Sequence, residues 1–205
     1  MKIGENNEIL LRGKTITPGY YRKPVSTAAA IDKDGWFHTG DAGRLEGRVL
    51  YLTDRIKDLF KTSNGKYICP QALETQFIID RYIDQVAIIA DERKFVSALI
   101  VPVYGLVEAY AKEKGIAYSS MEELLQHPKI QALYRARIDT LQQQFAHYEQ
   151  VKRFTLLPKP FSMERGELTN TLKLKRPIVA QNYKEIIDRM YEELSLIHIS
   201  EPTRL

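Results

Sequence analysis

The sequence predicts an α+β fold, in which a β-rich first part is followed by a second domain with helices packed on a small mixed sheet. Up to residue 56, short strand-like runs alternate with turn residues. Beyond residue 60, the apolar runs 86–90 and 96–103 are typical of central strands. Apolar residues at helical spacing follow from 106 to 145 and again from 177. The change of pattern predicts a domain boundary between the two parts.

The first part is predicted to consist mainly of strands and turns. Residues 8–12 are expected to form a strand that ends at Gly13, with no visible partner upstream. Residues 26–30 open a short helix, and the turn at 32–35 leads into a strand at 36–39. Residues 45–52 predict two short strands folded at Gly47.

The second part is predicted to begin with a hairpin. Asn64-Gly65 lies between two strand-like runs, which indicates a tight type I′ turn. Pro70 then opens a helix that reaches about residue 80. The polar turn 91–94 separates the two apolar runs, so those strands are expected to pair antiparallel.

Helices are predicted for most of the remaining chain. Ser120 and Glu123 have the spacing of a capping box. Pro128 opens a longer helix whose apolar positions reach Phe145. A strand returns at 151–157, and Pro177 begins a final helix.

Composition and charge indicate a soluble globular protein rather than a membrane or nucleic-acid-binding one. The 205 residues are 44% hydrophobic and 27% charged, and no apolar run approaches the roughly 18 residues of a membrane span. The net charge is +4 and the isoelectric point is about 9.0. Because the basic residues are mostly dispersed, we interpret them as a solvated surface and expect no nucleic-acid binding. The single cysteine, Cys69, fits a reducing compartment, so we expect a cytoplasmic protein.

The last residues of the chain, 194–205, are interpreted separately. Their sequence matches the translation of a transposase sequencing adapter in one frame, so we interpret them as an artefact of cloning or assembly. A natural helix extension with a polar end is the alternative. The tail is therefore excluded from the fold prediction.

Three segments contain the candidate functional residues. The first is the string Trp36-Phe37-His38-Thr39-Gly40-Asp41, the second runs from Thr53 through the hairpin to Ile68, and the third is Leu168–Arg176. Taken alone, Gly-Asp is usually a turn and Arg55 is a surface arginine. The basic residues at 173, 175 and 176 would likewise be a charge cluster without chemistry.

Taken together, these segments resemble the adenylate-forming superfamily, and in particular its AMP-forming long-chain fatty acid–CoA ligases. The resemblance extends to the strings 8–13 and 19–27 and covers residues 3–193. In that superfamily an Arg-x-Lys/Asp-Asp segment joins a large ATP-binding domain to a small mobile one. The resemblance implies that residues 1–56 are the C-terminal end of the large ATP/AMP-binding domain and residues 57–193 the mobile C-terminal domain.

The resemblance assigns two residues to the nucleotide. Asp41 matches the aspartate that holds the ATP ribose, since a carboxylate offers two acceptors to two vicinal hydroxyls. Gly40 before it lets the backbone come close to the nucleotide. Arg55 matches a second ribose ligand, for which a planar five-donor fork is suited. His38 is expected to be a structural or pocket-edge residue.

Two further residues are assigned to the rotation of the small domain and to CoA. Lys57 matches the hinge, where the backbone dihedrals change as the small domain rotates. Gly65, at the hairpin tip, matches a position that approaches the pantetheine arm of CoA. Its interpretation as a turn glycine is compatible with that role.

The resemblance makes Lys173 the candidate catalytic lysine. A mobile point charge would stabilise the negative charge that develops at the α-phosphate when a carboxylate attacks it. Lys175 is the alternative, because this chain departs from the motif at two positions. Leu172 stands where many members have glycine, and Asn170 where long-chain ligases often have proline.

The activity implied by the resemblance is a two-step ligation. ATP with Mg²⁺ and a fatty acid give acyl-AMP and pyrophosphate, and CoA then displaces AMP. The phosphate loop and the acyl pocket of the family lie upstream in the large domain, so we expect this chain to be a C-terminal fragment, inactive alone. Its expected partners are fatty acid, ATP, CoA and the large domain, with peripheral membrane contact left open and no metal ligands of its own.

Two other functions remain open from the sequence. The first shares the scaffold and is a fatty acyl-AMP ligase that loads a carrier protein instead of CoA. The second is a non-catalytic basic binding module, which would need an interleaved basic and aromatic face.

Overall fold

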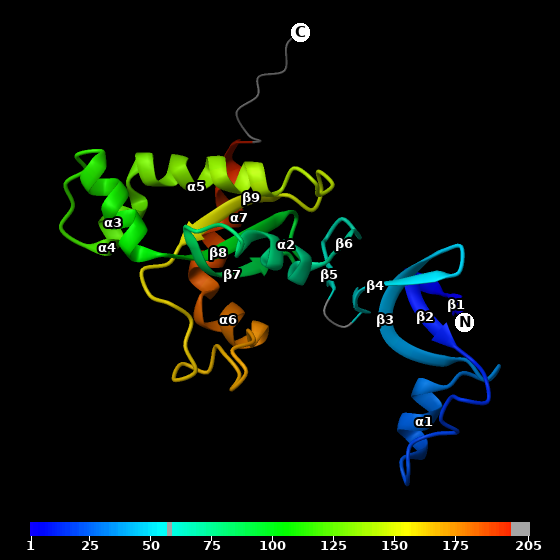
Figure 1. Ribbon diagram of the computed structural model, residues 1–205. Helices are drawn as coiled ribbons and strands as arrows, with labels where there is room; N and C mark the ends of the chain where they lie inside the picture. The colour runs from blue at the N-terminus through cyan, green and yellow to red at the C-terminus, as the bar shows by residue number, and fades with distance from the viewer. Residues whose placement is uncertain (57–58, 198–205) are drawn as a thin grey trace. The chain divides into compact units, whose positions relative to one another are not determined.

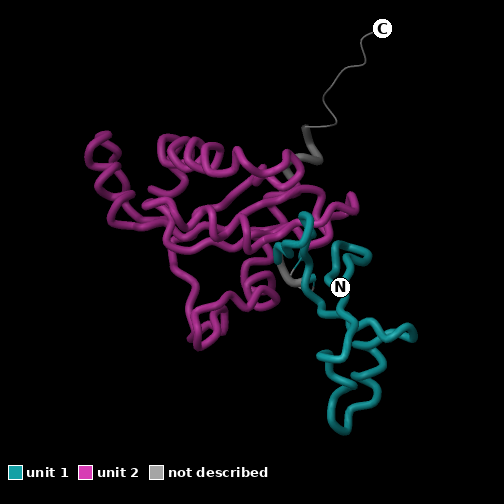
Figure 2. The backbone as a smooth tube through the Cα atoms, turned by 45° about the vertical axis from the view of Figure 1, so that its right-hand side comes forward, with its two compact units in different colours: residues 1–59 teal, residues 60–205 magenta. Residues whose placement is uncertain are grey.

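The computed structural model describes residues 1–56 and 59–197, with the backbone alone at 53–55 and 193–197. The chain divides into two compact units, residues 1–59 and 60–205 (Figure 2). The predicted hinge residue Lys57 and residues 198–205 of the predicted tail lie outside the described residues. The α+β fold class is confirmed, since both units contain helices and sheets.

Unit 1 is a four-stranded antiparallel sheet with strand order β1-β2-β3-β4. Its elements are β1 (Lys2–Ile3), the 3-10 turn η1 (Glu5–Asn7), β2 (Glu8–Leu11), α1 (Pro24–Ala30), β3 (Phe37–Glu46) and β4 (Val49–Arg55) (Figure 1). Gly47, with a φ of 61°, lies in the turn between β3 and β4, as predicted. The described core of this unit is small and contains Ile9, Leu10 and Ala42.

Two sequence predictions for unit 1 are wrong. The strand at 8–11 does have an upstream partner, because Lys2–Ile3 pairs with it antiparallel. The strands expected at 36–39 and from 45 are one continuous strand, β3. At Gly40 the φ of 71° would suggest a break in the strand. The strand continues past this residue because β3 pairs with β2 on one side and with β4 on the other.

Unit 2 is built on the three-stranded sheet β7-β8-β9, with β8 in the centre. The strands β7 and β8 pair antiparallel, as predicted, and β8 pairs parallel with β9. The elements of the unit are β5 (Phe60–Lys61), β6 (Tyr67–Ile68), α2 (Pro70–Phe77), β7 (Ile83–Ile89), β8 (Val96–Pro102), α3 (Tyr104–Glu113), α4 (Met121–Gln126), α5 (Pro128–Leu141), β9 (Val151–Leu156), α6 (Arg176–Asn182) and α7 (Lys184–Ile197).

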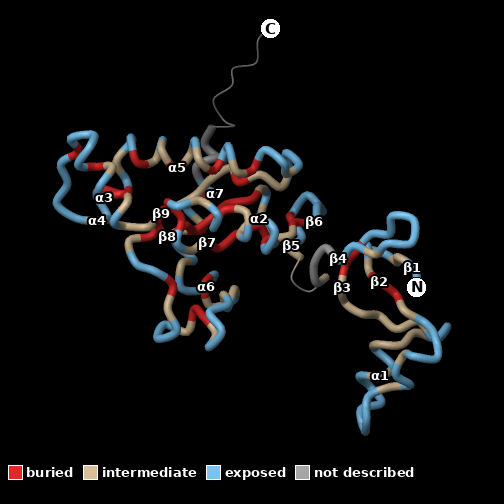
Figure 3. The backbone as a smooth tube through the Cα atoms, in the orientation of Figure 1, coloured by how far each residue is buried: buried red, intermediate tan, exposed pale blue. Residues whose placement is uncertain are grey.

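Helices cover both faces of this sheet. Alternate residues of a strand point to opposite faces, and accordingly Ala98 and Ile100 pack against α2–α5 while Leu99 and Val101 pack against α6 and α7. Figure 1 shows α5 on one side of the sheet and α6 on the other. Buried positions are concentrated along the sheet and the helix faces turned toward it (Figure 3).

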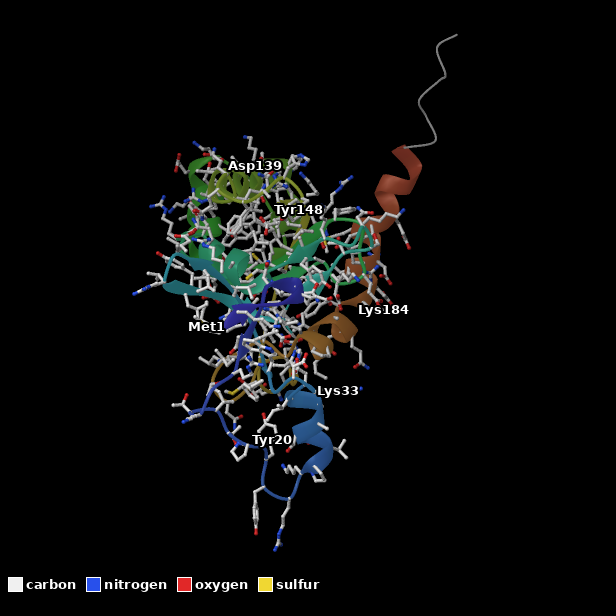
Figure 4. All side chains as sticks on the ribbon, turned by 90° about the vertical axis from the view of Figure 1, so that its right-hand side faces the viewer. Met1, Tyr20, Lys33, Asp139, Tyr148 and Lys184 are labelled. Carbon is white, nitrogen blue, oxygen red and sulfur yellow. The ribbon has the colours of Figure 1, made fainter. Side chains whose placement is uncertain are left out.

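Three predicted helix features of unit 2 differ in detail. The final helix is two helices, because Tyr183 leaves helical geometry with φ −108° and ψ 19°, and α7 then begins at Lys184 (labelled in Figure 4). The helix from Pro128 ends at Leu141 rather than at Phe145. At α4, Ser120 caps the Glu123 amide as predicted, but the Glu123 carboxylate accepts from the Ser119 amide instead of completing the box.

Candidate functional site

The segment Trp36–Asp41 in unit 1 is held by the carboxylate of Glu8. One oxygen accepts the Gly40 amide at 3.0 Å, and the other lies 2.8 Å from Nδ1 of His38. The Thr39 hydroxyl donates to the Ile9 carbonyl at 2.8 Å. The same hydroxyl accepts the Asp41 amide at 3.1 Å. These bonds fix the backbone on both sides of Gly40, immediately before Asp41.

The turn that leads into this segment is organised by Asp32. Its carboxylate accepts the amides of Asp34 at 2.9 Å and Trp36 at 2.8 Å. The hydrogen bond from the Trp36 amide, assisted by that from Asp34, holds the pKa of Asp32 below its usual value. The Trp36 ring is flanked by Lys2 and Arg12, whose charged groups lie 4.4 and 4.6 Å from the ring centroid.

The two predicted ribose ligands are brought together by the sheet of unit 1. Asp41 in β3 and Arg55 in β4 are direct cross-strand partners in the backbone register. Asp41 is half-buried. The side chain of Arg55 lies outside the described residues, so the structure relates these two positions through their backbones.

Gly65 lies in a hairpin turn of unit 2 that differs from the predicted type I′ turn. The Gly65 amide donates to the Thr62 carbonyl at 2.8 Å, and the Thr62 amide donates to the Lys66 carbonyl at 2.9 Å. Gly65 has a φ of 74°, whereas Asn64 is not among the residues with positive φ. The loop therefore has three residues and ends in a glycine bulge, because a type I′ turn would need positive φ at both central residues.

This hairpin is tied to the turn between β7 and β8. The Ser63 amide donates to the Arg93 carbonyl at 3.0 Å, and the Asn64 side chain donates to the Lys94 carbonyl at 3.3 Å. A Cβ added to Gly65 would meet nothing within 4 Å, so the tip is open to solvent. Glycine is needed here for its positive φ and not for lack of space.

The predicted lysine motif folds into a second turn of the same design. The Leu172 amide donates to the Thr169 carbonyl at 2.9 Å, and the Thr169 amide donates to the Lys173 carbonyl at 2.8 Å. The Thr169 hydroxyl accepts the Lys173 amide at 3.0 Å, as the Thr62 hydroxyl accepts the Lys66 amide at 3.1 Å. Leu172 takes the place of Gly65 and has a φ of 59°.

Lys173 and Lys175 are both exposed within this motif. Within the described part of the chain, neither ammonium group has a hydrogen bond or an ion pair. Arg176 is different, because its guanidinium makes a two-pronged pair with Glu74 of α2, at 2.6 and 2.7 Å. Arg176 thus fixes one end of the motif to α2. The sequence pattern had grouped this arginine with the two lysines.

No set of three or more histidine, cysteine, aspartate or glutamate side chains gathers at a metal-binding distance in the described part of the chain. Within the same residues, no helix is long and apolar enough to cross a membrane. The described surface contains an open cavity of about 350 Å³ in unit 2, between β7, α6 and α7, with Leu174 and Arg176 among its lining residues.

Comparison with known proteins identifies the second unit. Residues 57–195 match the family model of the AMP-binding enzyme C-terminal domain. The chain belongs to this family. The matched region contains Gly65, Lys173 and the turns that hold them, whereas Asp41 and Arg55 precede it.

Sequence similarity to known relatives covers both units of the chain. The chain is 36% identical over 193 residues to long chain acyl-CoA synthetase 6, peroxisomal, of Arabidopsis thaliana, an alignment that covers 91% of the chain and 27% of that protein. It is 33% identical to human long-chain-fatty-acid–CoA ligase 1, over 92% of the chain and 28% of that protein. The chain thus spans about a quarter of the length of these relatives.

A solved structure agrees with these relatives. The adenylation domain of a carboxylate reductase from Mycobacterium chelonae superposes with a TM-score of 0.68 at 26% identity, covering 90% of the chain and 27% of that domain's chain. The chain is therefore similar in fold to part of an adenylation domain.

Sequence reasoning missed the residues that support the candidate site. Glu8 and Asp32 hold the segment before Asp41, and Glu74 holds Arg176. Glu8 lies 32 positions from its partner Gly40, and Glu74 lies 102 positions from Arg176. Asp32 lies only 4 positions from its partner Trp36. Only the Asp32 contact has a local signal, since aspartate commonly bonds the backbone of its own turn.

Proposed function

We propose that the chain is the C-terminal part of an AMP-forming long-chain fatty acid–CoA ligase. The observation that supports this most strongly is the similarity of 91% of the chain to long chain acyl-CoA synthetase 6. In this proposal residues 1–56 complete a large ATP/AMP-binding domain, residues 57–193 form the mobile domain, and residues 194–205 are an adapter-derived tail.

The first half-reaction joins the fatty acid to AMP. A carboxylate oxygen of the fatty acid attacks the α-phosphorus of ATP, and pyrophosphate leaves with the electrons of the broken bond. In this proposal Asp41 and Arg55 hold the ribose, and their positions as cross-strand partners support a shared role. Lys173 stabilises the charge that develops on the α-phosphate, and its exposed position on a projecting turn supports that role.

The second half-reaction transfers the acyl group to CoA. The CoA thiolate attacks the acyl carbonyl, and AMP leaves. Lys57 acts as the hinge about which the small domain rotates, and the open tip at Gly65 then approaches the pantetheine arm. The free space around Gly65 is compatible with close approach of a ligand. Mg²⁺ would enter with ATP, at ligands supplied mainly by the large domain.

A carrier protein is the second candidate acceptor. A similar solved structure, at 25% identity and a TM-score of 0.67, is an adenylation domain joined to a carrier domain in a carboxylic acid reductase from Segniliparus rugosus. That arrangement favours a fatty acyl-AMP ligase as the alternative, with the same first half-reaction and a carrier-bound thiol as acceptor.

Exchange of radiolabelled pyrophosphate into ATP tests the proposal. The chain alone should show no exchange that depends on fatty acid above an Asp41→Ala control, because in this proposal the large domain supplies the phosphate loop and the acyl pocket. The chain joined to its upstream adenylating domain should show such exchange and should then consume CoA. Transfer to a holo-carrier instead of CoA would select the alternative, and absence of exchange in the joined enzyme would refute both.

A further inference from the structure

Glu167 is a buried carboxylate directly before the lysine motif. It is 1% exposed, yet it is charged and lies in a connection between β9 and α6 rather than in a helix or strand. Its oxygens accept from the Arg165 guanidinium at 2.8–3.1 Å, from the Asn182 side chain at 3.1 Å and from the Ser162 amide at 3.0 Å. Buried carboxylates are tolerated only when paired in this way.

The backbone of Glu167 closes the base of the turn that presents Lys173. The Lys175 amide donates to the Glu167 carbonyl at 2.8 Å, and Leu168 and Leu174 pair as an antiparallel bridge one step further in. Glu167 therefore links the turn to α6. Its main chain bonds the base of the turn, and its side chain bonds Asn182 of α6. Asn182 is the last residue of α6.

The connection before Glu167 is itself fixed to the sheet. The Phe161 amide donates to the Gln85 side chain of β7 at 2.6 Å, and the Phe161 ring packs edge-on against Tyr183 at 5.7 Å between centroids. The chain path from the sheet to Lys173 thus has two anchors, one at Phe161 and one at Glu167. The latter is the anchor adjacent to the lysine turn.

We infer that Glu167 is a positioning residue that sets where Lys173 is held for the adenylation step. The inference rests on the proposed function of Lys173. The Lys173 ammonium makes no hydrogen bond or ion pair with the residues that the structure describes, so its position follows from the backbone of its turn. That backbone is attached to α6 through Glu167, and misplacement of a catalytic group by about 1 Å can cost roughly 100-fold in rate.

Removing the charge should loosen the turn and leave the sheet intact. In Glu167→Gln, an amide nitrogen replaces one acceptor oxygen, so one of the three donors around it loses its partner. Glu164 provides a matched control. It is an exposed carboxylate in the same connection, and its side chain has no hydrogen bond or ion pair to any residue in the described ranges. Glu164→Gln changes the net charge equally and should change nothing else.

Hydrogen exchange on the 205-residue chain tests the anchoring without reference to catalysis. In Glu167→Gln the amides of residues 168–176 should exchange at least about tenfold faster, while those of β8 keep their wild-type rates. Equal rates in Glu167→Gln and Glu164→Gln would overturn the inference. If Glu167→Gln also loses protection in β8, Asn182→Ala decides the question, because it removes one exposed donor and should speed exchange in 168–176 alone.

The half-reactions test the consequence in the chain joined to its adenylating domain. Glu167→Gln should lower the adenylation rate by about tenfold or more and leave acyl transfer from supplied acyl-AMP within about twofold. In a Lys173→Ala background the same substitution should have no further effect, because a residue that acts through Lys173 cannot act without it. Equal loss of both half-reactions, or additive loss in the double variant, would overturn the inference. A wild-type enzyme without adenylation would refute the proposed function instead, and hydrogen exchange would still decide the anchoring.

Discussion

Leu172 is the residue at which the two similar turns of unit 2 differ most. Both turns begin with a threonine whose hydroxyl accepts an amide four positions later, and both end with a residue of positive φ, Gly65 at 74° and Leu172 at 59°. Residues other than glycine rarely adopt this backbone conformation, because it raises the free energy of the folded state by roughly 1–2 kcal/mol. The geometry explains why glycine suits this position, and leucine there carries local strain.

Leu172→Gly should therefore stabilise the protein. Relief of the positive φ is partly offset by the greater freedom of glycine in the unfolded chain, so we expect the free energy of unfolding to rise by about 0.5–1 kcal/mol. Leu172 is 68% exposed, so little packing is lost. Leu174→Gly is the control and should lower stability, since Leu174 packs against the α6–α7 core. Denaturant titration measures both, and a loss of stability in Leu172→Gly would show that the turn is unstrained.

Single residues could be predicted where a short motif carries them. Asp41, Gly65 and Lys173 were proposed from strings of neighbouring residues, and their roles stay predictions. Glu8 and Glu74 could not be found in this way, because they bond Gly40 and Arg176 across 32 and 102 positions. Glu167 lies two positions from Arg165, yet nothing in that local pattern shows that Glu167 is buried and bonded to Asn182 of α6.

Elements were predictable where periodicity and turn residues agree. The antiparallel pair β7–β8 followed from two apolar runs and a polar turn, and it is confirmed. The division between α6 and α7 was missed, because Tyr183 is neither glycine nor proline and the apolar spacing continues across it. Its ring packs against Phe161, so tertiary contact rather than local propensity accompanies the break.

At the scale of α7, Tyr191 anchors the helix to the strands β7 and β8. Its hydroxyl lies 3.1 Å from the Ile89 carbonyl, 3.0 Å from the Phe95 carbonyl and 2.8 Å from the Ser97 hydroxyl. Burial raises the pKa of Tyr191 to about 12, so the group stays protonated at neutral pH.

Deletion of residues 194–205 should therefore leave the melting temperature within about 2 °C of the full chain, because Tyr191 and the buried Met190 are retained. Tyr191→Phe should lower it by at least about 3 °C, since it leaves buried polar partners unsatisfied at a cost of about 1–3 kcal/mol. Calorimetry measures both changes. A larger drop on deletion than on Tyr191→Phe would mean that the tail packs and would contradict its interpretation as an artefact.

At the scale of the whole molecule, the chain divides into two compact units, and the boundary in the sequence lies two residues after the predicted hinge residue. The change from a β-rich to a mixed pattern predicted two parts, and the family match begins at residue 57. The proposed rotation of one part against the other belongs to the proposed complete enzyme. Sequence patterns report local structure and burial, so they contain no measure of that motion.

Lys57→Pro tests the hinge in the chain joined to its adenylating domain. Proline fixes φ near −65° and removes a backbone donor, so it should restrict rotation without touching the reacting groups. We expect acyl transfer to CoA to fall more than acyl-AMP formation, as measured by separate assays of the two half-reactions. An equal decrease in both would argue against a hinge at this position.

The central claim is that Lys173 acts in adenylation and not in thioester formation. In the joined enzyme, Lys173→Ala should lower fatty-acid-dependent pyrophosphate exchange by roughly 10²–10³, which is the usual cost of losing one preorganised charge-stabilising group. Thioester formation from supplied acyl-AMP should stay near the wild-type rate. Lys175→Ala is the matched control, because Lys175 is also exposed and lies two positions away. If Lys175→Ala abolishes exchange and Lys173→Ala leaves it intact, or if neither has an effect, the claim is wrong.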